Sequence, residues 1–331
     1  MRAAIIGLSG PALAGAERTL LRRLPPAGVI LFARNVESPP QLARLVADLR
    51  EMLRPEAVLM VDQEGGRVAR LRPPYWRAHP PAASLGRLFG ANPADGLRAS
   101  RLSGALIGLE CRAAGFDVVT APVLDRGLAG RHEVVGDRAF ASDPGTVARL
   151  GSAFASGLLA AGVQPVMKHV PGHGRAEVDS HTALPRVANG SLDCDLAPFA
   201  ANALLPWAMT AHILFPDWDA EHPATLSSTI IHTIIRGRVG FDGVLVSDDL
   251  AMHALSGSPA ARAAAALAAG CDLALYCAAE QAANEAVLAS IPELRPSAWQ
   301  RLAKARAMAA AHKIELNAAS LAAERDRLLA L

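Results

Sequence analysis

The sequence lacks the features that mark several classes of protein. Its 331 residues contain no run as long as the roughly 18 uninterrupted apolar residues that a membrane-spanning helix needs. The cysteines show neither a C-x-x-C pair nor another spacing typical of metal ligands; they are Cys111, Cys194, Cys271 and Cys277. We therefore expect no membrane partner, and reduced thiols in a reducing compartment.

An excess of charge of one sign is also missing. Lys and Arg together number 33, Asp and Glu 31, and the net charge is +2. No basic stripe alternates with aromatic residues, which argues against nucleic acid as the main partner. Internal repeats and low-complexity linkers are absent too. We expect one domain over residues 1–331, acting as a monomer.

The amino-terminal segment permits two interpretations. Met1-Arg2 followed by AAIIGLSGPALAGA resembles a short signal peptide. Cleavage there would remove a segment with the pattern of a first strand, so we expect a cytoplasmic protein.

Short apolar runs are what the sequence has in abundance. Hydrophobic residues make up 51% of the chain, enough to fill a large core. The runs do not alternate strictly with polar residues, which is typical of parallel strands buried on both faces. They are residues 3–8, 28–33, 57–62, 116–124, 163–169, 207–213, 243–248 and 271–277.

Helical patterns separate these runs. Ser38 and two prolines precede one such segment, Asp143 and a proline precede another that Gly162 ends, and residues 261–269 are rich in alanine. Strands alternating with helices predict an α/β fold, a TIM-type (β/α)₈ barrel, with a helical tail over about 291–331. An open doubly wound sheet is the alternative, but no G-x-G-x-x-G follows the first run.

Charged and histidine side chains close several of these runs. Barrel enzymes carry their chemistry on the face where the strands end, so these residues are expected to gather there. They are Asp62, Asp125, Lys168, His169, His212 and Asp248.

The segment VDQEGGRVARLR (61–72) has a structural and a functional interpretation. It fits a strand, a tight turn and a salt-bridged helix start. In the functional interpretation Asp62 accepts hydrogen bonds from substrate hydroxyls and Arg70 donates at the rim. The pair Gly65-Gly66 would then let the backbone approach a ligand closely.

The segment KHVPGHGRAEVDSH (168–181) concentrates histidines and acids. A metal site is one interpretation, but the spacing matches no standard zinc signature and Pro171-Gly172 breaks any helix. A structural loop is another. We favour an acid/base pair, because Asp179 and His181 share a face in an extended segment and a carboxylate stabilises an imidazolium.

The segment FDGVLVSDDL (241–250) ends a buried run with two adjacent acids. Asp249 is expected to cap the following helix. Asp248 is then free to point into the barrel mouth as a nucleophile or base.

Taken together, these blocks resemble glycoside hydrolase family 3, in particular its bacterial β-N-acetylglucosaminidase branch. The resemblance covers about residues 28–277, most of the chain. Its motifs are GVILFARN (28–35), VDQEGGRVAR (61–70), APVLD (121–125), GDRAFASDP (136–144), KHVPGHG (168–174), DSHTALP (179–185), MTAHI (209–213) and SDDLAM (247–252).

The resemblance implies a role for each matching residue. The family's nucleophile falls on Asp248, its acid/base on His181, and the support of that histidine on Asp179. The sugar-binding positions that it implies are Asp62, Arg70, Arg138, Lys168 and His169. Neither a cofactor nor a metal is implied.

The resemblance also implies a reaction and a substrate. Relatives of this kind act in the cytoplasm on recycled cell-wall fragments, and we expect a retaining exo-β-N-acetylglucosaminidase. Its small carbohydrate substrates would be β-1,4-linked muropeptides, GlcNAc-1,6-anhydro-N-acetylmuramic acid with or without peptide. The alternatives are a β-glucosidase of the same family, a non-catalytic sugar-binding barrel and a metal-dependent barrel hydrolase.

Two departures from the family pattern stand out. Many relatives carry Asp-Thr where this chain has Arg175-Ala176. The segment RGLAGRHEVV (126–135), shortly before Arg138, also differs from the commoner pattern.

Overall fold

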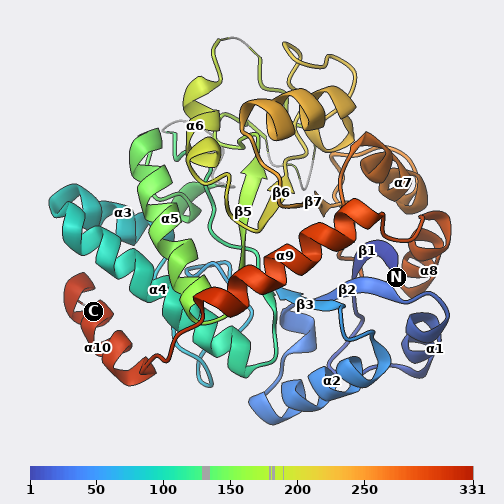
Figure 1. The fold of residues 1–331 in the computed structure, drawn as a ribbon, viewed down its shortest axis with the longest axis horizontal. Coiled ribbons are helices and arrows are strands. Elements are labelled where there is room, and N and C mark those ends of the chain that lie inside the picture. Colours follow the sequence, from blue (N-terminus) through green and yellow to red (C-terminus); the bar gives the residue numbers. More distant parts are fainter. Residues whose placement is uncertain (129–134, 179, 181–182, 189, 331) are drawn as a thin grey trace.

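The strands form a closed barrel. The computed structural model describes residues 1–128, 135–178, 180, 183–188 and 190–330. Within them, eight parallel strands pair in sequential order around the barrel (Figure 1). The strands are β1 (Arg2–Gly7), β2 (Pro26–Leu31), β3 (Val58–Val61), β4 (Val118–Val119), β5 (Gln164–Val170), β6 (Trp207–Thr210), β7 (Val244–Asp249) and β8 (Leu273–Tyr276). Each overlaps one of the predicted runs, so the TIM-type barrel is confirmed.

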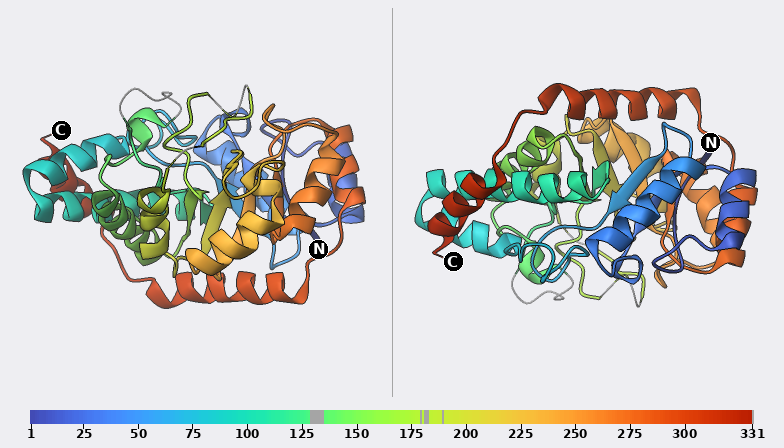
Figure 2. Two further views of the ribbon diagram at one scale, coloured as in Figure 1. Left: turned by 90° about the horizontal axis from the view of Figure 1, so that it is seen from above. Right: turned by 90° about the horizontal axis from the view of Figure 1, so that it is seen from below.

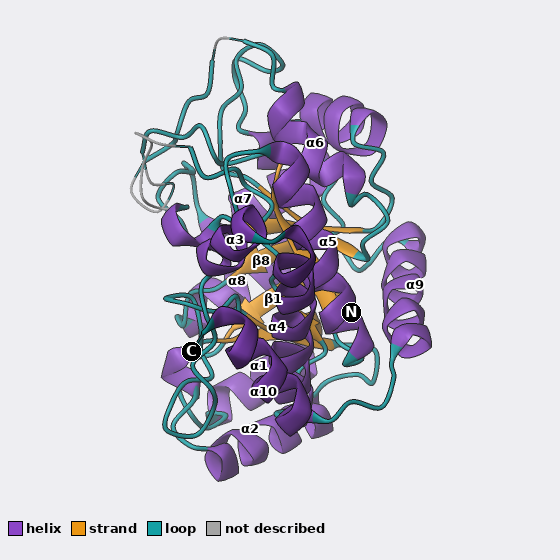
Figure 3. Ribbon diagram, turned by 90° about the vertical axis from the view of Figure 1, so that its left-hand side faces the viewer, coloured by secondary structure: helices purple, strands orange, loops and turns teal. Residues whose placement is uncertain are grey.

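Helices surround the strands on the outside (Figure 3). The α-helices are α1 (Gly15–Arg23), α2 (Pro39–Met52), α3 (Ala82–Ala91), α4 (Pro93–Ala113), α5 (Pro144–Ala160), α6 (Asp193–Ala201), α7 (Pro259–Ala269), α8 (Gln281–Ser290), α9 (Pro296–His312) and α10 (Ala318–Leu329). A π-helix, η4 (Ile230–Arg238), and the short turns η1 (Ala33–Asn35), η2 (Gly136–Arg138) and η3 (Ala224–Leu226) complete the set. In the described residues, no helix is both long and apolar enough to cross a membrane.

Local sequence signals explain where the helices begin and end. The Ser38 hydroxyl accepts a hydrogen bond from the Gln41 amide at the start of α2. The Asp143 carboxylate accepts one from the Thr146 amide, 2.7 Å away, at the start of α5. Such caps satisfy amide groups that the first helical turn leaves without partners. After α5, Gly162 adopts a φ of +81°, which glycine tolerates and which ends the helix.

The chain after residue 291 contains α9 and α10. Helix α9 packs against α5, β5 and β7, and α10 packs against α3 and α4. Both views in Figure 2 show α9 across the side of the barrel opposite the loops that follow β5. The parallel strands therefore have their amino ends near α9 and their carboxyl ends at a mouth built of loops.

Candidate active site

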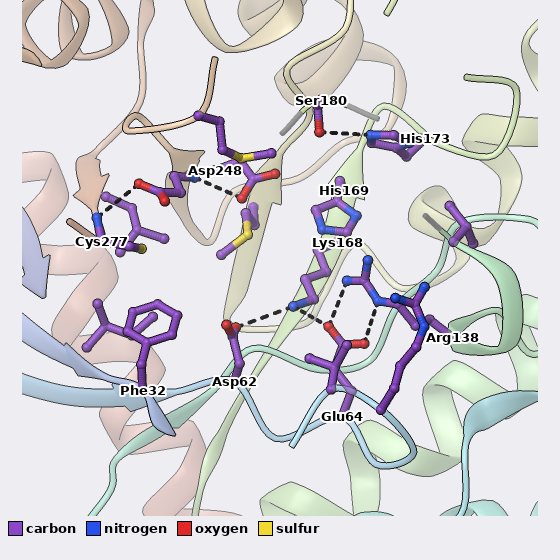
Figure 4. A pocket seen from close by; sticks show the side chains of 18 of the residues that line it. Phe32, Asp62, Glu64, Arg138, Lys168, His169, His173, Ser180, Asp248 and Cys277 are labelled. Atoms are coloured by element: carbon purple, nitrogen blue, oxygen red, sulfur yellow. Dashed lines mark hydrogen bonds and ion pairs between the residues drawn. The ribbon is translucent and has the colours of Figure 1, made fainter. Parts of the chain in front are cut away.

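A cavity of about 810 Å³ opens at the carboxyl ends of the strands (Figure 4). Most of the predicted site residues line it: Asp62, Arg70, Arg138, Lys168, His169 and Asp248. The other two, Asp179 and His181, lie outside the described residues. The fold thus brings together residues from the ends of β3, β5 and β7 and from the loops between them.

Asp62, directly after β3, accepts hydrogen bonds from several polar side chains on the cavity floor. Its carboxylate takes a 2.8 Å ion pair from Arg70 and a hydrogen bond from the Thr120 hydroxyl, and Lys168 Nζ lies 3.6 Å away. Burial alone would raise the pKa of Asp62, but Lys168 and Arg70 outweigh burial and hold it well below its usual value. Asp62 is therefore an ionised acceptor at neutral pH.

Glu64 joins the same cluster, although it is not among the site residues predicted from the sequence. Its carboxylate accepts two hydrogen bonds of 2.8 Å from Arg138 and an ion pair of 2.6 Å from Lys168. Burial would raise the pKa of Glu64, but Arg138 and Lys168 together lower it to about 2. Figure 4 shows Lys168 reaching between Asp62 and Glu64, with Arg138 beside Glu64.

A second network supports two histidines, His169 within β5 and His173 after it. Asp125 lies 2.6 Å from His169 Nδ1 and accepts the His173 backbone amide at 2.7 Å. Burial would raise the pKa of Asp125, but His169 and His173 lower it to about 2. A buried carboxylate on Nδ1 fixes the ring orientation of His169. His169 therefore presents its other ring nitrogen from a fixed position.

The adjacent acids at the end of β7 have different surroundings. Burial would raise the pKa of Asp248, but the His169 and His212 side chains and the Asp249 amide lower it. For Asp249, burial dominates and raises the pKa. The Asp249 carboxylate accepts the amides of Ala251 and Cys277, both at 2.9 Å. Both acids line the cavity. Asp248 is the ionised one, while Asp249 ties β7 to the chain after β8.

That arrangement corrects the expectation that Asp249 caps the next helix. Asp249 holds a turn, and α7 begins only at Pro259, where the Ser258 hydroxyl accepts the Ala261 amide at 3.2 Å. The sequence could not separate the two roles, because a carboxylate that follows a strand fits a turn and a helix start equally well.

The interpretation of Gly65-Gly66 is also wrong. A Cβ on Gly65 would lie 2.5 Å from the Pro80 carbonyl oxygen, and one on Gly66 would lie 2.7 Å from the Pro81 side chain. Both glycines have positive φ. They are needed for close packing against another segment of this chain, and the segment that follows them is a series of turns in place of the helix start.

The other side of the cavity is less polar. Phe32 lies there, with the Arg34 guanidinium 4.8 Å and the Arg70 guanidinium 5.2 Å from its ring centre. Figure 4 places Phe32 and Cys277 away from the Glu64–Arg138 pair. The apolar residues that line the cavity as a whole are Ile30, Phe32, Val68, Val135, Met209, Met252 and Leu275. A ligand would therefore meet charged groups on one side and an apolar surface on the other.

Ser180, the described residue between Asp179 and His181 in the sequence, lines the cavity and is buried. Its hydroxyl lies 3.3 Å from His173 Nε2, and its carbonyl accepts the Ala254 amide at 3.2 Å. Ser180 is therefore held both by the chain after β5 and by the chain after β7.

The two departures from the family pattern have structural counterparts. Arg175 pairs with Asp195 of α6 at 2.7 Å and donates to the Ser191 carbonyl at 3.1 Å, and Ala176 is buried. This part of the chain is thus fastened to α6. Within residues 126–135, residues 129–134 lie outside the described part, while Arg138 immediately after it lines the cavity.

Among the described residues, no group of three or more His, Cys, Asp or Glu side chains could hold a metal ion. The positive charges on the cavity floor are the side chains of Arg70, Arg138 and Lys168. Three cations facing two carboxylates can donate hydrogen bonds to several hydroxyl groups of one ligand.

Sequence reasoning missed Glu64, His173 and Phe32. Glu64 and His173 stand inside motifs that had been singled out, VDQEGGRVAR and KHVPGHG, which was the available signal. Phe32 stands inside a third quoted motif, GVILFARN, but a phenylalanine directly after a buried strand looks like core.

The chain is similar in sequence to known glycoside hydrolases. The profile of the glycosyl hydrolase family 3 N-terminal domain matches residues 6–315. A beta-hexosaminidase of Pseudomonas aeruginosa is 42% identical over 307 residues, 90% of each chain.

Two solved structures are similar in fold. NagZ from Neisseria gonorrhoeae, in complex with N-trifluoroacetyl-D-glucosamine, has a TM-score of 0.85 and 30% identity over 99% of this chain and 97% of its own. A family 3 β-N-acetylglucosaminidase from Paenibacillus sp. has a TM-score of 0.85 and 31% identity over 98% of this chain and 66% of its own.

Proposed function

This chain belongs to glycosyl hydrolase family 3 and is a β-N-acetylglucosaminidase, and we propose that it removes GlcNAc with retention of configuration through a glycosyl-enzyme on Asp248. The observation that carries the proposal is the position of Asp248. It is the next-to-last residue of β7, lines the cavity opposite the Asp62–Lys168–Glu64 cluster, and has a lowered pKa. An ionised, half-buried carboxylate facing a ligand-sized cavity is suited to nucleophilic attack.

In the first step, an Asp248 oxygen attacks the anomeric carbon. The bond from that carbon to the departing sugar oxygen breaks, and its electron pair goes to the oxygen. The imidazolium of His181 donates the proton that this oxygen needs. In the second step the neutral imidazole takes a proton from water, the water oxygen bonds to the anomeric carbon, and the Asp248 carboxylate is released.

Asp179 has a supporting role in the proposal. A carboxylate next to an imidazole stabilises the imidazolium and orients the ring. The contacts of Ser180, the residue between Asp179 and His181, support the assignment. Ser180 lines the cavity and is bonded to His173, after β5, and to Ala254, after β7. Asp179 and His181 themselves lie outside the described residues.

The floor cluster accounts for sugar binding in the proposal. Asp62 accepts hydrogen bonds from hydroxyls, while Lys168, Arg70 and Arg138 donate to them, and His169 offers its free ring nitrogen. Binding the hydroxyls that do not react fixes the anomeric carbon near Asp248 and so lowers the entropic part of the barrier.

We assign the substrate class to muropeptides, with terminal GlcNAc β-1,4-linked to 1,6-anhydro-N-acetylmuramic acid, and place the reaction in the cytoplasm. The support is the resemblance to family members that degrade recycled cell-wall fragments.

Proton NMR of the reaction with this disaccharide tests the substrate and the stereochemistry together. The proposal expects β-GlcNAc to appear first and to mutarotate afterwards. Early release of α-GlcNAc would contradict the double displacement, and an uncleaved disaccharide would contradict the substrate assignment.

A further inference from the structure

Charged side chains on the cavity floor alternate in sign along a continuous line. Arg70 pairs with Asp62 at 2.8 Å, and Asp62 lies 3.6 Å from Lys168. Lys168 pairs with Glu64 at 2.6 Å, and Glu64 pairs with Arg138 at 2.8 Å. Four of these residues are matched to sugar binding by resemblance. Glu64 is the one that is not.

Glu64 touches two of those four residues at once. Its Oε1 accepts from both Lys168 Nζ and an Arg138 nitrogen, while its Oε2 accepts from Arg138 Nε. The side chain is 6% exposed. With both oxygens bonded to cations, and with its pKa near 2, Glu64 cannot act as a proton donor at neutral pH and has little capacity left for a substrate hydroxyl.

The chain around Glu64 is itself fixed. The Glu64 amide donates to the Val68 carbonyl and the Gly66 amide to the His79 carbonyl, each at 2.9 Å. The close packing of Gly65 and Gly66 against Pro80 and Pro81 holds the same turn. The glycine pair that we first interpreted as a ligand contact thus serves to place the Glu64 carboxylate.

We propose that Glu64 is a positioning residue, which sets Lys168 Nζ and the Arg138 guanidinium at the places from which they bind the sugar hydroxyls. The inference rests on the proposed function for the identity of the sugar. A lysine ammonium sits on a flexible four-carbon stem, and ordering it costs rotamer entropy. Glu64 supplies that order before substrate arrives, so binding energy is not spent on it.

Removing the charge has a definite consequence. Without a carboxylate at position 64, Asp62 is the one acid left on the floor line for three cations. Lys168 and Arg138 would repel each other and turn toward Asp62 and Asp248. Loss of one partner in a buried ion pair is costly because it leaves the other charge uncompensated.

The variant Glu64→Gln keeps the shape and removes the charge. A matched control is Asp272→Asn, because Asp272 is also a buried carboxylate between two arginines, Arg236 at 2.9 Å and Arg301 at 3.0 Å. Asp272 precedes β8 and so lies at the opposite end of the barrel from the cavity. The two variants should lose similar thermal stability, while kcat/KM should fall ~100-fold in Glu64→Gln and stay within about threefold in Asp272→Asn.

Coupling to the substrate distinguishes positioning from stability. Aryl β-GlcNAc substrates lacking the 3-, 4- or 6-hydroxyl are compared in the wild type and both variants. Where Lys168 or Arg138 binds the missing hydroxyl, the deoxy penalty should shrink at least ~10-fold in Glu64→Gln and stay unchanged in Asp272→Asn. Additive losses for every hydroxyl would overturn the proposal.

A crystal structure of Glu64→Gln tests the same claim without activity. Lys168 and Arg138 should leave their wild-type positions while Asp62 and Asp248 keep theirs. If both cations keep their wild-type positions, the positioning role of Glu64 is overturned, whether or not the wild-type enzyme is active. A wild type that hydrolyses no β-GlcNAc substrate would refute the proposed function alone, since the displacement in the crystal would still be observable.

Discussion

At the scale of single residues, the surroundings of a side chain decide its role. Asp248 and Asp249 are neighbours of the same type, yet the pKa of Asp248 is lowered and that of Asp249 is raised. Both line the cavity, but Asp248 lies near the His169 and His212 side chains, whereas Asp249 is bonded to two backbone amides. Sequence position identified the pair, and only the folded surroundings separate the acid that we propose as nucleophile from the acid that holds a turn.

His173 gives a stability prediction at this scale. The ring is buried among Asp125, His169, Ser180 and, farther off, Asp248, and burial lowers its pKa from 6.5 to about 4 although Asp125 opposes the shift. Below pH 6.5 the unfolded chain therefore binds a proton that the folded chain does not. Stability is lost as the pH falls from about 6.5 to about 4, by roughly 3 kcal/mol from this group.

Urea unfolding of the wild type and His173→Gln across that pH range tests this. The variant should be less stable at pH 7 and should lose less stability on acidification. Because the buried carboxylates titrate in both proteins, the difference between the two curves reports on His173. Parallel curves for the two proteins would show that His173 does not carry the proton linkage.

A second residue-scale prediction concerns His181. If His181 protonates the departing oxygen, His181→Ala should slow cleavage of the disaccharide by ~1,000-fold or more and slow an activated dinitrophenyl β-GlcNAc far less. Steady-state rates on the two substrates give the comparison. Equal losses on both would mean that His181 only binds sugar.

At the scale of elements, much of the fold could be predicted from the sequence. The strands stand out as apolar runs because helices cover them outside and side chains fill the barrel inside. Caps at Ser38 and Asp143 fixed two helix starts, because a cap bonds to amides two or three residues away. Contacts over long separations could not be predicted in this way. Glu64 meets Arg138 across 74 residues, and Gly65 meets Pro80 through a turn that no local pattern encodes.

Helix α10 supplies a prediction at this scale. Arg325 is buried, and its guanidinium lies 3.1 Å from His79 Nδ1 in the segment that packs against Gly66. Arg325→Met keeps the apolar stem and leaves His79 without its donor, so the free energy of unfolding should fall by about 1–3 kcal/mol. Arg327→Met on the same helix, at an exposed position, is the control.

Chemical denaturation of the two variants measures the difference. Arg327→Met should match the wild type. If Arg325→Met also matches it, the buried guanidinium does not fasten α10 to the barrel.

At the scale of the whole molecule, the carboxyl ends of the barrel strands hold a cavity lined by both charged and apolar side chains. A sugar with a 2-acetamido group can use both, because its hydroxyls need donors and acceptors and its methyl group needs apolar contact. We predict that kcat/KM for aryl β-GlcNAc exceeds that for aryl β-glucoside by at least ~100-fold, or roughly 2.7 kcal/mol at the transition state. Comparable rates on the two substrates would favour a β-glucosidase and contradict the preference for GlcNAc.

The central claim, a covalent intermediate on Asp248, is tested most directly by trapping it. The enzyme is incubated with a fluorinated GlcNAc donor whose glycosyl-enzyme hydrolyses slowly, and the labelled peptide is sequenced by mass spectrometry. Our account predicts one GlcNAc derivative per chain, attached to Asp248, and no label in Asp248→Ala. A label on Asp249, or turnover of the donor by Asp248→Ala at the wild-type rate, would contradict it.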